Sequence, residues 1–158
     1  MRDILNKKLL VLCVAIPLLV GGIAAFFTKD AMAMFTQLDK PPLSPPGWLF
    51  PVVWTILYTL MGISSYLIAN SKRPTEDKTR ALSVYAASLF VNFLWSFFFF
   101  NMEWYFFSFL WLLLLWSLII VMIIEYWGIN KTAALLTIPY LLWVTFAGYL
   151  NFGIWWLN

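Results

Sequence analysis

Long stretches without a charged residue divide this chain. The uncharged windows lie between Lys8 and Lys29 (20 residues), Lys40 and Lys72 (31), Arg80 and Glu103 (22), Glu103 and Glu125 (21), and after Lys131 (27). A helix needs roughly 20 apolar residues to cross a bilayer core of about 30 Å. The five windows therefore predict five transmembrane helices.

The composition agrees with a membrane protein. Apolar residues make up 63% of the chain and charged residues 11%, whereas soluble domains carry about 45–50% and about 25%. The apolar runs are continuous and do not alternate as barrel strands do, which favours helices. We predict an all-α integral membrane bundle in one domain, 1–158. Its five transmembrane helices cover about 5–27, 47–69, 80–101, 104–126 and 132–155, and a proline-rich lid loop covers 28–46.

The first window has a second interpretation, an N-terminal signal peptide. Lys7 and Lys8 precede the apolar run, and Ala31-Met32-Ala33 offers a small-x-small cleavage pattern. The run is longer than a usual signal core of about 7–15 residues. Lys29 and Asp30 also interrupt it before the alanines. We therefore favour a membrane anchor.

The basic residues predict the orientation. With five spans, the N-terminus and the loops 70–79 and 127–131 share one side, which together with Arg80 at the adjoining span end carries eight Lys or Arg, against two on the other side. Lys and Arg concentrate on the cytoplasmic side of a plasma membrane. We expect a multi-pass protein of the cell membrane with its N-terminus in the cytoplasm and its C-terminus outside.

Missing residue types exclude several chemistries. The sequence has no histidine and one cysteine, Cys13, so it offers neither an imidazole metal ligand or general base nor a thiolate zinc cluster. We expect no metal. The positive charges lie at the ends of apolar runs, which is typical of membrane topology and not of nucleic-acid binding. Acidic and basic residues also fall at the span ends, so no buried proton relay is visible.

Aromatic residues form stripes on three predicted helices. Five of the ten tryptophans lie near span ends, where an interfacial belt explains them; the deeper ones are Trp54, Trp95, Trp111, Trp116 and Trp143. Helical spacing places three of them on shared helix faces with other residues. The groups are Trp54, Tyr58 and Met61; Asn92, Trp95 and Phe99; and Trp143, Ala147 and Leu150, with Asn151 beside them. Such stripes usually pack a core. Together with the amides they also suggest a cavity for a flat, largely apolar ligand. For Asn92 and Asn151, interhelical bonding and pocket lining remain equal alternatives.

The connection before the second span is stiff. Lys40-Pro41-Pro42-Leu43-Ser44-Pro45-Pro46 contains four prolines and cannot form a regular helix. It is either a rigid connector or a lid over the non-cytoplasmic end of the bundle. A short helix is possible upstream, between Ala31 and Leu38.

Several motifs resemble those of one family. They are Pro17 with Gly21-Gly22; Lys40 through Pro46 to Gly47-Trp48; Pro51-Val52-Val53-Trp54-Thr55-Ile56-Leu57-Tyr58 with Met61-Gly62; Asn92 with Trp95; and Pro139-Tyr140-Leu141-Leu142-Trp143 through Phe146-Ala147 to Leu150-Asn151-Phe152. In order and spacing they resemble the translocator protein family, whose bacterial members are called tryptophan-rich sensory proteins and whose animal members are called peripheral benzodiazepine receptors.

The resemblance implies a function as well as a fold. Such proteins are membrane-lipid-embedded bundles, usually homodimers, that bind porphyrins such as protoporphyrin IX and synthetic isoquinoline carboxamides. Bacterial members promote light-dependent oxidative breakdown of the porphyrin, which is then ligand or substrate and not a resident cofactor. Carried over residue by residue, the ligand-binding set would be Trp54, Tyr58, Asn92, Trp95, Trp143, Ala147, Leu150, Pro41, Pro42 and Pro45, with Trp54 and Trp143 as the catalytic pair.

The sequence departs from the family in two places. The animal sterol motif at the end of the last span needs a tyrosine followed by Lys or Arg. Here Phe152 replaces the tyrosine and no base follows, so sterol binding is not supported. Phe107 and Trp111 stand where animal members carry tryptophan and an acidic residue, which leaves the contribution of the fourth span to the pocket open.

Physical chemistry fits a metal-free porphyrin. The deep tryptophans offer faces for an aromatic disc, Lys40 or Lys29 could meet its carboxylates, and no histidine is present to ligate iron. Two other functions remain open: a transporter or carrier of such ligands, and a ligand-responsive regulatory membrane protein. For the homodimer we expect the 80–101 helix as the interface, because Ser83 and Ala87 form a small-xxx-small pair flanked by Ala86 and Ser88. Packing of the same small residues within one chain is the alternative.

Overall fold

Five long helices form the molecule. The computed structural model describes the backbone of residues 2–158 and the side chains of residues 6–31, 33 and 35–158. Every regular element in these residues is a helix: α1 (Arg2–Thr28), α2 (Ala31–Phe35), α3 (Leu49–Ala69), α4 (Thr75–Ser96), the π-helical turn η1 (Phe97–Asn101), α5 (Tyr105–Ile129) and α6 (Lys131–Leu157). With α4 and η1 taken as one rod, five helices are long and apolar enough to span a membrane. The predicted all-α five-span bundle is confirmed.

The rod of α4 and η1 begins earlier than the predicted span. It starts at Thr75 and not near residue 80, after Pro74 in extended conformation. Glu76 and Asp77 occupy its first turn, where carboxylates favour the positive end of the helix dipole. A window defined by the absence of charge misses such a turn.

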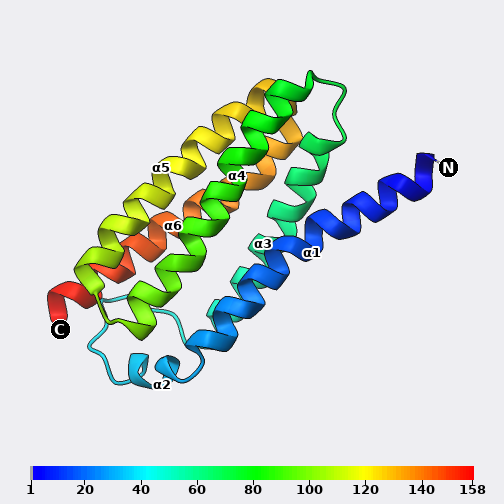
Figure 1. Cartoon of the computed structure of the whole chain (residues 1–158). Coiled ribbons are helices and arrows are strands. Elements are labelled where there is room, and N and C mark those ends of the chain that lie inside the picture. The colour runs from blue at the N-terminus through cyan, green and yellow to red at the C-terminus, as the bar shows by residue number, and fades with distance from the viewer. Residues whose placement is uncertain (1) are drawn as a thin grey trace.

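The helices pack as neighbours of opposite direction (Figure 1). α5 contacts α4 and α6, α3 contacts α1 and α6, and α2 lies with the long loop at the end of the bundle that also holds the C-terminus. α1 lies at the side, and its N-terminal part runs away from the other helices. The core therefore lies among α3, α4, α5 and α6, with Ile68, Ala81, Leu115, Ile119 and Tyr140 fully buried. The tryptophans expected at span ends are all exposed: Trp48, Trp104, Trp127, Trp155 and Trp156.

Small residues set the contacts of α3 with its neighbours. A Cβ on Gly62 would lie 2.5 Å from the Cα of Val14 and 2.7 Å from the carbonyl oxygen of Cys13, so only glycine permits this approach of α1. Pro17 has no N–H to offer the Cys13 carbonyl, and that carbonyl faces Gly62 instead. On the other side of α3, Ser64 donates a hydrogen bond of 2.7 Å to the Ala133 carbonyl of α6.

The proline segment of the long loop is fastened to α6. The Tyr149 hydroxyl donates to the Pro42 carbonyl at 2.8 Å. The side-chain amide of Asn158 bridges both backbone groups of Asp39, at 3.1 and 2.9 Å. Pro41 packs on Gly153 so closely that a Cβ there would lie 2.5 Å from its ring. These contacts fix the segment on the outer end of α6.

Candidate ligand-binding site

A cavity of about 500 Å³ lies in the loop-side half of the bundle. Its walls come from α1, α3, the α4–η1 rod and α6, and Phe35 of α2 closes its outer end. The volume is within the range of about 300–1,000 Å³ that is typical of small-molecule pockets. On each of these four long helices, one lining residue lies farthest from the loop: Leu18, Tyr58, Trp95 and Ala147.

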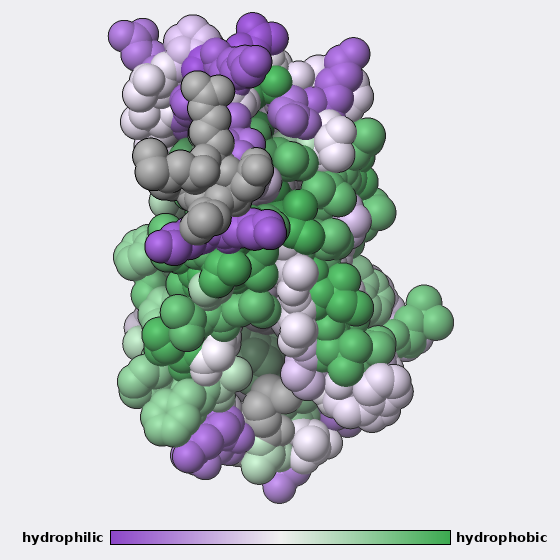
Figure 2. All heavy atoms as spheres, turned by 90° about the vertical axis from the view of Figure 1, so that its right-hand side faces the viewer, coloured by the Kyte–Doolittle hydropathy of each residue, from purple (hydrophilic) through white to green (hydrophobic). Residues whose placement is uncertain are grey.

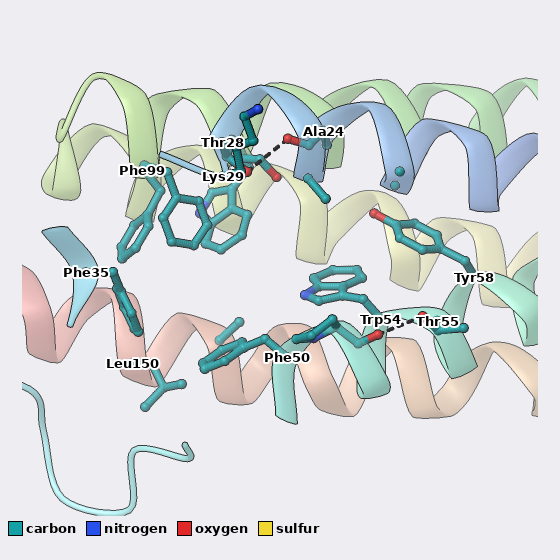
Figure 3. Close-up of a pocket in the computed structure, with 18 of the residues that line it drawn as sticks. Ala24, Thr28, Lys29, Phe35, Phe50, Trp54, Thr55, Tyr58, Phe99 and Leu150 are labelled. Atoms are coloured by element: carbon teal, nitrogen blue, oxygen red, sulfur yellow. Dashed lines mark hydrogen bonds between the residues drawn. The ribbon is translucent and has the colours of Figure 1, made fainter. Parts of the chain in front are cut away.

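Two stacked aromatic pairs form much of the wall. Trp54 and Tyr58 lie one turn apart on α3, with ring centroids 5.3 Å apart and planes inclined by 30°. Trp95 and Phe99 stack in the same way across the junction of α4 and η1, at 5.3 Å and 24°. Figure 3 shows Trp54, Tyr58, Phe50 and Phe99 around the open space, with Phe35 toward its outer end. The cavity therefore presents ring faces and edges suited to an aromatic ligand.

The π-helical turn contributes to this wall. η1 consists of four phenylalanines and Asn101, and both Phe99 and Phe100 line the cavity. A π-helical turn has an extra residue relative to an α-helical turn, and such turns are frequent at functional sites. Here it lets two consecutive phenylalanines contribute to one surface.

Asn92 lies behind the cavity wall and contacts it through Tyr58. Its side-chain Nδ2 donates to the Tyr58 hydroxyl at 2.9 Å, and it is 2% exposed. It does not line the cavity. Its other polar atom, Oδ1, is buried without a hydrogen-bond partner in the described part of the chain. Asn92 therefore positions Tyr58 and does not face a ligand directly.

Asn151 joins three helices beside the cavity. Its Oδ1 accepts from the Trp95 indole N–H and from the Ser108 hydroxyl, both at 3.1 Å. Its Nδ2 donates to the Tyr105 carbonyl at 2.8 Å. One buried amide on α6 thus fixes the ring of Trp95 on α4 and the start of α5. This is the interhelical alternative for Asn151, although the residue also borders the cavity.

Comparison with known proteins identifies the family. The family model for TspO/MBR proteins matches residues 13–157. The chain belongs to the TspO/MBR family. It is 38% identical to the tryptophan-rich protein TspO of Chlorobaculum tepidum over 98% of this chain and 99% of the relative.

More distant TspO/MBR relatives come from bacteria and animals. The protein CrtK of Rhodobacter capsulatus is 36% identical over 87% of this chain and 85% of its own length. The translocator protein of Bos taurus is 31% identical over 89% and 84%. Membership of this family and the five apolar helices make the chain a multi-pass membrane protein.

The structure brings together half of the residues that the family resemblance placed in the pocket. Those that line the cavity are Trp54, Tyr58, Trp95, Ala147 and Leu150. Trp143 does not line the cavity. Its ring packs edge to face on that of Phe50, a lining residue, with centroids 5.9 Å apart, and its indole N–H is buried without a partner among the described residues.

The three prolines of the predicted set lie elsewhere. Pro41, Pro42 and Pro45 do not line the cavity, and the first two are held on α6 by the contacts described above. The loop residues that do reach the cavity are Lys29 and Phe35. The covering residues thus come from the start of the loop and α2, not from the proline segment.

Some lining residues had a sequence signal and others had none. Phe50 lies one turn before Trp54, so extending the stripe of Trp54, Tyr58 and Met61 backward would have found it. Met61 itself is 1% exposed in the core and does not line the cavity. Phe35 is the last residue of the five-residue helix α2 within the long connection, and no periodic pattern indicates where its ring lies.

Proposed function

We propose that this protein binds a porphyrin, with protoporphyrin IX as the best candidate, and promotes its light-dependent oxidative degradation. The observation that carries the proposal is the apolar cavity walled by two stacked aromatic pairs. A porphyrin is a rigid aromatic disc, so it gains most from ring faces held in place before it binds. The family resemblance supports the same ligand class.

The proposed chemistry uses oxygen, light and an indole. Dioxygen is the oxidant: one carbon–carbon double bond of the macrocycle breaks, and each of its carbons becomes a carbonyl that keeps one oxygen atom. The protein therefore neither gains nor loses electrons over the whole reaction. Trp54 lines the cavity and acts as a transient one-electron donor to the excited ring, regaining its electron before the product leaves. No acid–base pair is needed, since the ligand supplies the photochemistry and the protein supplies position and a redox partner.

The mutants that test this proposal are Trp54→Phe and Trp143→Phe. Phenylalanine keeps a ring that stacks but lacks the easily oxidised indole. Losing part of one aromatic contact should weaken binding by about 1 kcal/mol. Porphyrin absorption and fluorescence, measured in darkness and then under light, give the degradation rate divided by the bound fraction. This ratio should fall strongly for Trp54→Phe and less for Trp143→Phe, because Trp54 lines the cavity and Trp143 does not.

Trp127→Phe is the matched control. Trp127 is an exposed tryptophan near the end of α5 that lies away from the cavity, with Lys131 over its ring at 5.7 Å. This variant should keep both binding and the ratio. If Trp54→Phe also keeps the ratio, its indole is only a wall of the pocket and the degradative function is refuted. Absence of porphyrin binding to the unmodified protein would refute the whole proposal.

The carrier function is the second candidate. An opening of the cavity toward the lipid, described below, would suit a protein that takes up membrane-dissolved ligands. In the other half of the bundle, however, the interior is filled by fully buried side chains such as Met61, Ile68 and Met122. A carrier would have to open this half as well. Light-independent porphyrin flux into liposomes that contain the protein would favour the carrier.

We also propose the orientation that the basic residues predict, with the N-terminus in the cytoplasm and the loop and cavity facing outward. Ser44 is half-buried in the proline segment. In a background without the native cysteine, Ser44→Cys should react with an impermeant maleimide added to intact cells. Reaction only after the cells are broken would reverse the orientation.

A further inference from the structure

One charged side chain borders the cavity. Among the lining residues, Lys29 alone carries a charge; the rest are apolar, aromatic or neutral polar. Lys29 follows directly after the end of α1 and is exposed. Figure 3 shows its side chain at the edge of the site, on the opposite side of the space from Trp54. The stacked pair of Trp54 and Tyr58 and the charged group thus lie on different sides of the site.

Lys29 is available for an anionic partner, whereas Lys40 is engaged. Both ion pairs in the described part of the chain are made by Arg80, so no described carboxylate lies within 4.0 Å of the Lys29 ammonium. That ammonium lies 4.8 Å from the centre of the Phe26 ring. The Lys40 ammonium instead donates to the carbonyls of Thr36 and Leu38, at 3.2 and 3.4 Å, and does not line the cavity.

The cavity opens on the same face of the molecule. Besides Lys29, four lining residues are exposed: Gly22 and Ala25 on α1, and Pro51 and Thr55 on α3. A side chain on Gly22 would meet no atom within 4 Å of its Cβ. Figure 2 shows a hollow in this face, among apolar side chains. The opening between α1 and α3 therefore faces the lipid, and Lys29 lies one turn beyond Ala25 at its outer end.

We infer that Lys29 is a specificity-determining residue that selects ligands with a carboxylate at one edge of a flat apolar body. This inference rests on the proposed function and adds the ligand class and its orientation. In a membrane, such a ligand already has its carboxylate at the interface and its ring in the hydrocarbon. Moving between α1 and α3 leaves the carboxylate at that depth, beside Lys29, while the ring reaches Trp54.

The polarity of the cavity requires this orientation. An ionised carboxylate is strongly disfavoured in an apolar space without a charged partner, and the deep part of the cavity offers only neutral groups. The ring would lose its aromatic contacts if it turned toward the exposed rim. The long, flexible stem of a lysine lets its ammonium meet a carboxylate at the rim without moving the helix.

Two forms of one porphyrin test the inference. Protoporphyrin IX and its dimethyl ester share the ring, but the ester has no charge. Their dissociation constants are measured by fluorescence titration in a neutral detergent, in darkness, for the unmodified protein, Lys29→Met and Lys40→Met. Methionine keeps an unbranched apolar stem without the charge. Lys40→Met is the matched control, since it removes a second outer lysine that lies outside the cavity lining.

Lys29→Met should weaken binding of the free acid roughly three- to tenfold, the scale of one partly exposed charge pair, and leave the ester unchanged. Lys40→Met should change neither, and Lys29→Arg should restore preference for the acid. The inference is overturned if Lys29→Met lowers both affinities equally, changes neither, or matches Lys40→Met. If neither porphyrin binds the unmodified protein, it is the proposed function that fails.

Discussion

Replacing Asn151 by leucine should loosen the cavity wall and the bundle together. Leucine has the same branched shape and number of heavy atoms but removes three hydrogen bonds, to Trp95, Ser108 and Tyr105. Side-chain hydrogen bonds in membrane proteins contribute about 0.6 kcal/mol each on average, which gives about 2 kcal/mol. The Trp95 N–H then loses its buried acceptor at a further cost of about 1–3 kcal/mol. We expect Asn151→Leu to lower the free energy of unfolding by about 3–5 kcal/mol.

A double-mutant cycle isolates the contact that matters for the cavity. Unfolding free energies in mild detergent are compared for Asn151→Leu, Trp95→Phe and both together. The coupling should be about 0.6–1.7 kcal/mol, between the measured average and the measured maximum for such bonds. Ser117→Ala is the control, because that hydroxyl is exposed and bonds only its own helix; it should change stability by less than about 0.5 kcal/mol. A coupling near zero would refute the assignment of Asn151 as the residue that holds Trp95.

Three further predictions concern helix surfaces. Gly22→Phe should fill the opening between α1 and α3 and slow porphyrin association, measured by stopped-flow fluorescence, roughly tenfold. Gly128→Phe, whose new side chain also meets open space, is the control and should not change the rate. Equal rates for the two variants would contradict the lipid-facing entrance. Gly62→Ala should lower the unfolding free energy by about 1–3 kcal/mol, since its Cβ would strike the α1 backbone; an unchanged melting temperature in detergent would contradict that contact. Ala86→Phe, on an exposed part of α4, should shift the predicted homodimer toward monomer in light scattering, and an unchanged mass would remove this face as the interface.

The five-span fold was predictable because a bilayer acts on composition alone. Each span needs only sufficient length without charge, so the windows locate the helices without any knowledge of their contacts. The start of α4 was misplaced because Glu76 and Asp77 belong to the helix while lying ahead of the apolar run. The exposed tryptophans at the span ends follow from the same physics, since the interface attracts amphipathic rings wherever they stand in the fold.

The cavity was predictable only in part. Spacing along one helix placed Trp54 beside Tyr58, because that relation is local. Whether Trp143 or Phe50 lies nearer the cavity depends on how α3 and α6 pack, which no period within one helix specifies. Ser88 shows the same limit: it belonged to the expected dimer surface, yet it is fully buried within the bundle. The aromatic character of the site could thus be expected, but its membership required tertiary structure.

The cavity itself follows from the way α1 meets α3. Near the cytoplasmic side, by the orientation proposed above, the backbone of α1 rests directly on Gly62. Pro17 lies immediately before Leu18, the first α1 residue of the cavity wall, and a proline within a helix removes a hydrogen bond and favours a kink. Beyond it, Gly21 lets the Tyr58 ring lie directly against α1, since a Cβ there would overlap that ring, and Gly22 leaves open space beside it. Two features that weaken a soluble helix, an internal proline and a pair of glycines, here leave room for a ligand between two helices that are otherwise in close contact.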